Sequence, residues 1–165
     1  MFTQIVIGLV QYQTVALRPA GIFMEYVMNK EIHKYLSLAF NSVENAPLEC
    51  DGFSLMLAVK LDEAGWPYKR LAGVVHDRIS QRTVQPHLWI ETHGLIIDYR
   101  LRMWLPNVTS LRVPNGVFST DFALQSGFNY DGVAVSRPGI SSSIIRFMSD
   151  GFSDKICLGN YINYA

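Results

Sequence analysis

The sequence has few charged residues, few cysteines and no long hydrophobic run. Charged residues occupy 17% of the 165 positions, and 14 basic residues balance 14 acidic ones. This balance lacks the electrostatic footprint of a general nucleic-acid or anionic-membrane binder. Two cysteines cannot form a disulfide framework, so reduced thiols and a cytoplasmic location are expected. No window approaches the roughly 18 consecutive apolar residues of a membrane-spanning helix, so no membrane association is expected.

The composition predicts one globular domain over residues 1–165. Hydrophobic residues make up 49% of the chain and aromatic residues 12%, as in ordinary soluble domains. The apolar run from Met1 to Val10 lacks the basic start and the small-residue cleavage pattern of a signal peptide, so we expect a core segment there. There is no repeat and no Gly/Ser linker, although the character of the sequence changes near Pro106.

Two helices are predicted in the N-terminal half. Over residues 19–40, apolar side chains recur at three- and four-residue steps, and a proline at the first position suits a helix start. The second helix begins at Glu49 or Cys50 and ends at Ala64. Gly65 can take the left-handed conformation there, and Pro67 cannot continue the helix. Apolar residues nearly surround this second helix, so it should be central and buried.

Three strands are predicted next, over residues 68–76, 86–92 and 95–101. Only His93-Gly94 separates the last two, which is a strong hairpin signal. Beyond Pro106 the pattern weakens. It indicates a turn at 114–116, strands at 117–122 and 133–136, and a strand or short helix at 141–148. We expect a core at about 48–101 and assign no function to 106–165.

The hairpin fixes a register. Thr92 faces Leu95 and Ile90 faces Ile97, so that the two isoleucines share one face of the sheet. The opposite face then carries His87, Trp89, Glu91, Ile96, Asp98 and Arg100. His87 and Asp98 become diagonal neighbours, within reach of a side-chain hydrogen bond.

A cysteine at the start of a buried helix, followed by a histidine and an aspartate on adjacent strands, supplies the parts of a thiol nucleophile. The helix N-terminus stabilises negative charge at Cys50, whose backbone N–H is a candidate oxyanion donor. His87 would accept the thiol proton and return it to a leaving group. Asp98 would orient the imidazole. The adjacent carboxylate of Asp51 opposes a thiolate unless it points away.

The order and spacing are recognisable in four segments: Cys50-Asp-Gly-Phe-Ser-Leu-Met-Leu-Ala, Leu61 to Gly73, His87-Leu-Trp-Ile-Glu91 and Ile97-Asp98. Together they resemble the core of the transglutaminase-like superfamily, papain-related enzymes with Cys, His and Asp in that order. The resemblance covers about residues 48–101, and the His-x-Trp strand after the Cys helix is characteristic of the family. It implies an α+β, papain-like fold with N-terminal helices packed on an antiparallel sheet.

By resemblance, Cys50 is the nucleophile, His87 the general base and acid, and Asp98 the orienting carboxylate. The expected activity is a thiol hydrolase of the peptidase or amidase type, working through a thioester that water resolves. Its partner would be a peptide, protein or amide substrate, with no organic cofactor or metal implied and no oligomeric state indicated. Acyl transfer to an amine is the alternative reaction. A catalytically inactive protein-binding module on the same scaffold is the alternative from another class.

Two further residues are candidates for support of the site. Trp89 is expected either to pack beside the His87 ring or to anchor the sheet face. Papain relatives place a Gln a few residues ahead of the Cys, and Asn45 could substitute for it here.

The remaining polar candidates have plainer interpretations. Cys157 is predicted to be a small core residue, and His33 a helix-surface residue. Glu91 is expected to hydrogen-bond Arg100 or Arg102. A metal site that joins His76 and His93 to His87 and Glu91 is disfavoured, because the spacing matches no familiar ligand set.

Overall fold

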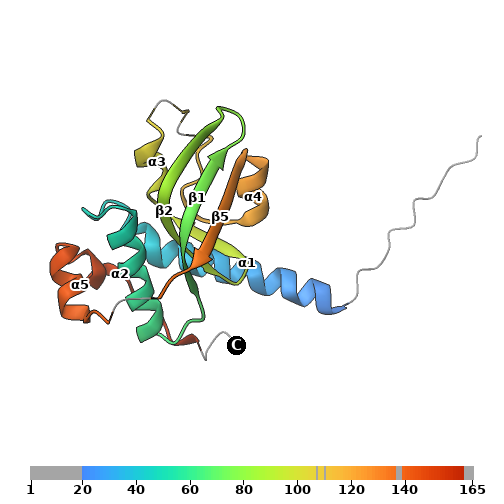
Figure 1. The fold of residues 1–165 in the computed structure, drawn as a ribbon. Coiled ribbons are helices and arrows are strands. Elements are labelled where there is room, and N and C mark those ends of the chain that lie inside the picture. The colour runs from blue at the N-terminus through green and yellow to red at the C-terminus, as the bar shows by residue number, and fades with distance from the viewer. Residues whose placement is uncertain (1–19, 107, 110, 137–138, 162–165) are drawn as a thin grey trace, which may run out of the picture.

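The computed structural model describes residues 20–106, 108–109, 111–136 and 139–161, with side chains in the first helix described from Asn29 onward (Figure 1). The elements are α1 (Ala20–Asn41), α2 (Cys50–Glu63), β1 (Lys69–Asp77), β2 (Arg82–Thr92), β3 (Leu95–Asp98), α3 (Leu101–Trp104), β4 (Gly116–Ser119), α4 (Thr120–Gln125), β5 (Phe128–Ala134), α5 (Ser142–Met148) and the 3-10 turn η1 (Phe152–Lys155). The predicted core segment Met1 to Val10 and the helix start at Pro19 lie outside the described residues.

Both predicted N-terminal helices are present. The end of α2 follows the prediction, because Gly65 has a φ of 70° and the N–H of Trp66 turns back to the carbonyl of Leu61 at 2.9 Å. The apolar residues of α2 are buried almost all round the helix, as its sequence indicates. No helix among the described residues has the length and apolarity needed to cross a bilayer.

The strands form one antiparallel sheet in the order β4-β3-β2-β1-β5. The predicted hairpin register is confirmed, because Ile90 pairs with Ile97 and Thr92 pairs with Leu95. The α+β class, with helices packed on an antiparallel sheet, is therefore observed. In Figure 1 the long helix α1 passes beneath the strands, α5 lies next to α2, and α3 and α4 lie at the other end of the sheet.

The sheet separates two hydrophobic cores. Ile90 and Ile97 face the first core, which α1 and α2 complete with Leu36, Phe40, Met56 and Leu57. Trp89 and Ile96 face the second core, together with Val75, Leu101, Phe118 and Phe128. The predicted alternation of faces along β2 and β3 is thus confirmed. Each face buries large apolar side chains, which is the main stabilising contribution to such a sheet.

The predicted strand over 95–101 is too long. The chain turns after Asp98, because one carboxylate oxygen of Asp98 accepts the backbone N–H groups of Arg100 at 2.8 Å and Leu101 at 3.2 Å. The predicted strand over 86–92 is too short, because residues 82–84 also pair with β1. Because β3 ends at Asp98, Arg100 lies beyond the strand.

Beyond Pro106 the predicted elements are partly wrong. The strand expected over 117–122 ends at Ser119, whose hydroxyl accepts the Phe122 N–H at 3.1 Å and starts α4. The strand expected over 133–136 is instead β5, which begins at Phe128 and ends at Ala134. The ambiguous segment 141–148 is the helix α5, which Ser141 caps. Serine side chains compete well for the first N–H groups of a helix, and a strand pattern of short length does not reveal this.

A buried ion pair ties the far end of β1 to the segment before β4. The Asp77 side chain, which is 1% exposed, accepts Nη1 of Arg112 at 2.8 Å and the Ile79 N–H at 3.0 Å. The hydrogen bonds from Arg112 outweigh burial and hold the pKa of Asp77 well below its usual range. This carboxylate therefore stabilises the fold wherever it is ionised in both the folded and unfolded chains.

We expect Asp77→Asn to lower the free energy of unfolding by about 2 kcal/mol near neutral pH, because charged hydrogen bonds to Arg112 are lost. A depressed folded pKa stabilises above the unfolded pKa of about 3.9, so the difference from wild type should shrink as the pH falls below about 4. Urea unfolding across this pH range measures both. The exposed variant Glu31→Gln is the control, and equal stability of Asp77→Asn and wild type at neutral pH would contradict the assignment.

Candidate active site

The site is centred on a buried histidine and aspartate that link β2 to β3. Nε2 of His87 lies 2.7 Å from Oδ2 of Asp98, and the two side chains are 0% and 1% exposed. The hydrogen bond predicted from the hairpin register is therefore confirmed. Because both groups are buried, neither is stabilised by water, and each depends on the other for its charged form.

Four groups surround the Asp98 carboxylate. Besides His87 and the N–H groups of Arg100 and Leu101, the hydroxyl of Tyr130 donates to Oδ2 at 2.9 Å. Burial favours the neutral acid, but the charge and hydrogen bond of His87, with the Arg100 N–H and Tyr130, hold the pKa of Asp98 below its usual range. Burial and the nearby Asp98 charge raise the pKa of Tyr130 well above 10, so its hydroxyl keeps its proton and stays a donor.

Tyr130 lies in the segment 106–165, to which no function is assigned from sequence. It belongs to β5, at the edge of the sheet farthest from β4, yet its ring centroid lies 6.0 Å from that of Phe118 on β4. The sheet therefore curls until side chains of its two edge strands meet. Only this curvature brings Tyr130 to Asp98, and no local sequence pattern reports it.

The surroundings of the His87 ring favour its protonated form. Burial alone lowers its pKa, but the charge and hydrogen bond of Asp98 and the nearby Cys50 thiol together raise the pKa of His87 to about 9. A buried imidazolium of this kind is stabilised by its carboxylate partner rather than by solvent. Asp98 therefore favours a ring that can act as a proton donor.

Cys50 is the first residue of α2 and lies beside this ring. Its side chain is buried, at 7% exposure. Asp98 occupies Nε2 of His87, which leaves Nδ1 for the thiol. Nδ1 is buried, and no described residue offers it a hydrogen bond of full geometry, while the thiol lies close enough to raise the pKa of the ring. The first N–H groups of a helix have no intrahelical partner, so they face any negative charge that forms here.

The charge of Asp51, which opposes a thiolate, is partly balanced. Asp51 is exposed, and its Oδ1 accepts the next backbone N–H, that of Gly52, at 2.6 Å. Arg70 on β1 donates to the Asp51 carbonyl at 3.2 Å and to the Ser54 hydroxyl at 3.1 Å, and its charge attracts that of Asp51. Arg70 therefore connects the first turn of α2 to β1.

Arg100 holds the loop that leads into Cys50. It is 4% exposed and donates to the carbonyls of Glu44 at 2.7 Å, Ala46 at 2.7 Å and Leu48 at 2.5 Å. Its guanidinium also lies 3.9 Å from the centre of the Phe53 ring. A planar group with five donors suits this task, and lysine could not reproduce it.

The predicted bond between Glu91 and Arg100 or Arg102 is wrong. Glu91 accepts the indole N–H of Trp89 at 3.3 Å, whereas Arg102 donates to the carbonyl of Val113 at 3.1 Å. Arg100 lies beyond the end of β3, so the alternation of strand faces no longer applies to it. Sequence reasoning therefore missed its role in positioning the Cys50 helix.

Trp89 fulfils both structural expectations. Its ring stacks on that of His87 with centroids 6.1 Å apart and planes inclined by 21°, and it also belongs to the second core at 1% exposure. Gly132 on β5 makes room for it, since a Cβ at that position would lie 2.5 Å from the indole. The indole is thus held between the sheet and the imidazole, and it keeps water from that side of the ring.

A pocket of about 390 Å³ opens beside Cys50. It lies between the start of α2, the first half of β2 and the end of α3, and is lined by Glu49, Cys50, Asp51, Thr83, Val84, Gln85, Pro86, Leu88 and Trp104. Asn45 is exposed and is not among these residues. It lines a separate hollow near Arg100, so the structure does not bring it to the pocket at Cys50.

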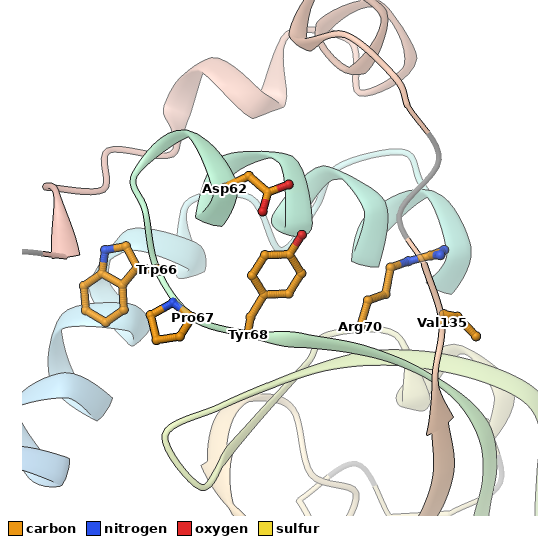
Figure 2. A pocket seen from close by; sticks show the side chains of 6 residues that line it. All are labelled: Asp62, Trp66, Pro67, Tyr68, Arg70 and Val135. Atoms are coloured by element: carbon orange, nitrogen blue, oxygen red, sulfur yellow. The ribbon is translucent and has the colours of Figure 1, made fainter.

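A second hollow of about 390 Å³ lies along the other side of α2 (Figure 2). After α2 the chain reverses, and β1 runs back beneath the helix, so Tyr68 points toward α2 near Asp62 and Arg70 lies nearer its start. The lining residues of this hollow include no cysteine and no histidine. This hollow therefore offers no thiol or imidazole for nucleophilic chemistry.

Two further sequence interpretations, those of Cys157 and His33, are corrected by the structure. Cys157 is exposed, so the prediction of a core cysteine is wrong. His33 is half-buried rather than a helix-surface residue, and its Nε2 donates to the Val117 carbonyl of β4 at 2.8 Å. His93 hydrogen-bonds Thr92 and Tyr161, while His76 hydrogen-bonds Thr83. The described residues hold no group of three His, Cys, Asp or Glu side chains placed to bind a metal.

Comparisons with family models, with curated proteins and with solved structures find no match for this chain.

We expect Asp98→Asn to lower the pKa of His87 from about 9 to its ordinary value of about 6.5 or less, because burial then outweighs the remaining attractions. An NMR titration of the His87 ring measures this shift. The exposed variant Asp131→Asn should leave the His87 titration unchanged. A His87 pKa near 6.5 in the wild-type protein would contradict the charged pair.

We expect Arg100→Lys to reduce the free energy of unfolding by roughly 2 kcal/mol, because an ammonium cannot serve three loop carbonyls at once. Denaturant unfolding gives the stability. Arg102→Lys is the matched control, since Arg102 is exposed and donates to a carbonyl outside this loop. Similar stability of both variants would show that the loop does not depend on Arg100.

Proposed function

We propose that this chain is a cysteine hydrolase with a papain-like, transglutaminase-like fold, acting on amide bonds of a peptide or protein. One observation carries the proposal: a thiol at the start of a helix lies beside a buried imidazole that is hydrogen-bonded to a buried carboxylate. Cys50 would be the nucleophile, His87 the proton donor and acceptor, and Asp98 the group that keeps His87 charged and oriented.

The charge of His87 sets the resting state of this mechanism. An imidazolium cannot take a further proton from the thiol, so the nucleophile in this proposal is a Cys50 thiolate paired with a protonated His87. This refines the expectation that His87 removes the thiol proton during the reaction. The positive ring and the helix N-terminus both stabilise the sulfur anion.

The reaction then proceeds in two halves. The thiolate attacks the amide carbon, a C–S bond forms, and the backbone N–H of Cys50 is the candidate donor to the oxyanion. His87 gives the proton at Nδ1 to the leaving amine as the C–N bond breaks, which leaves a thioester. In the second half the neutral His87 takes a proton from water, whose oxygen attacks the thioester. The C–S bond breaks, the acid is released and the ion pair is restored.

Hydrolysis is favoured over acyl transfer because water needs no dedicated acceptor site. Two features also favour an enzyme over an inactive binding module. The buried Nδ1 of His87 lacks a hydrogen-bond partner of full geometry among the described residues. An unpaired buried polar atom destabilises the fold, and a catalytic role would explain why it is retained. The adjoining pocket, moreover, gives a substrate access to Cys50.

We expect iodoacetamide to label Cys50 at least about tenfold faster than Cys157 near pH 6, because only a stabilised thiolate reacts quickly there. The structure makes this test stringent, since Cys157 is exposed and Cys50 is buried. Accessibility alone predicts the reverse order. Peptide mass spectrometry of both cysteines over time gives the two rates.

The variant His87→Ala is the matched control, because it should slow the labelling of Cys50 and leave that of Cys157 unchanged. Faster labelling of Cys157, with Cys50 insensitive to His87→Ala, would leave the binding module as the better account.

A further inference from the structure

The pocket beside Cys50 has an uneven distribution of charge and apolar surface. Two carboxylates, those of Glu49 and Asp51, flank the nucleophile, and no lysine or arginine lines the pocket. The positive charge of Arg70 partly compensates that of Asp51, and Arg70 lines the other hollow along this helix. Glu49 is exposed, and its side chain does not cap α2. Its negative charge therefore faces the pocket with the least compensation.

The opposite wall of the pocket is largely apolar, although Thr83 and Gln85 of β2 also line it. Val84, Pro86 and Leu88 line it from β2, and Trp104 lines it from the end of α3. Trp104 is 46% exposed, so its indole is accessible from the pocket. An indole in this position offers a flat surface for an aliphatic or aromatic side chain, and it also attracts cations through its ring face.

The strand that forms this wall has an open edge. On its β3 side, β2 pairs only over Ile90 to Thr92 among the described residues, because the chain leaves the sheet at Asp98. On either side of a register shift at Gln85 and Pro86, the stretch from Thr83 to Leu88 pairs with β1 alone, and Pro86 can offer only its carbonyl. Alternate residues of an unpaired strand direct their N–H and C=O groups outward, where an extended peptide can pair with them.

We propose that the pocket binds an extended peptide segment, with a cationic side chain next to Glu49 and an apolar side chain against Trp104. The open edge of β2 would align the peptide backbone so that its amide carbon meets the Cys50 sulfur. This inference rests on the proposed function, because the peptide is taken to be the substrate of that thiol.

The test uses short synthetic peptides that carry a chloroacetamide group. The Cys50 sulfur forms a C–S bond to the methylene carbon as the C–Cl bond breaks and chloride leaves. Two probes share one leucine and differ only in having lysine or glutamate beside it. The full-length protein is treated with each probe, and adduct formation at Cys50 is followed by intact mass.

The lysine probe should label Cys50 about tenfold faster than the glutamate probe at low ionic strength. Glu49→Gln should reduce this ratio to roughly threefold, since one carboxylate of the pair remains. The ratio of the two rates cancels any change in the intrinsic reactivity of the thiol. Asp121→Asn removes a charge from a different hollow and should leave the ratio unchanged. Equal rates, or a faster glutamate probe, would overturn the charge preference.

Two further comparisons test the apolar wall and the open edge. Replacing the probe leucine with glycine should slow labelling of the wild type several-fold and that of Trp104→Ala much less. Methylating the probe amides one at a time should slow labelling up to about tenfold at one position, where a hydrogen bond to β2 is lost. No effect at any position would exclude pairing with this edge.

Iodoacetamide separates failure of this inference from failure of the proposed function. Fast, His87-dependent alkylation of Cys50 with no discrimination among the probes would overturn the peptide preference and leave the thiol chemistry intact. Slow alkylation of Cys50 by every reagent would overturn both.

Discussion

The hydrogen-bonded pair of His87 and Asp98 is the constraint on which the rest of the site depends. Both side chains are buried, so the charge on each is stable only while the other is present. The molecule surrounds this pair with matching groups: N–H donors from the turn after β3, the Tyr130 hydroxyl from β5 and the Trp89 ring alongside. Such a concentration of buried polar groups is costly for stability alone, and this cost supports the catalytic role proposed for the pair.

Local patterns were sufficient to predict the parts of the fold that local physics determines. The Gly65 stop of α2 and the hairpin at His93-Gly94 follow from backbone conformations that few residues adopt, and both are present as predicted. The hairpin register alone placed His87 next to Asp98. Predicted element boundaries are wrong where a side chain accepts backbone N–H groups, as Asp98 does at the end of β3 and Ser119 does at the start of α4.

The residues missed in the site share a different cause. Arg100 was assigned to a strand face, but its guanidinium reaches a loop more than fifty positions earlier in the chain. Tyr130 reaches Asp98 only because the sheet curls. Neither contact has a periodicity or a spacing that a single sequence displays, since both depend on how distant segments pack. Asn45 illustrates the converse: a suitable residue type ahead of Cys50 that the loop directs elsewhere.

The carboxylate that orients His87 and the guanidinium that anchors the Cys50 loop are separated by Tyr99 alone. The groups that hold the imidazole and the loop before the sulfur therefore come from one short stretch of chain. An inserted or deleted residue here would displace the Arg100 guanidinium relative to Asp98, and with it the loop that leads into Cys50. The dipeptide after Asp98 therefore couples the position of the sulfur to that of the imidazole.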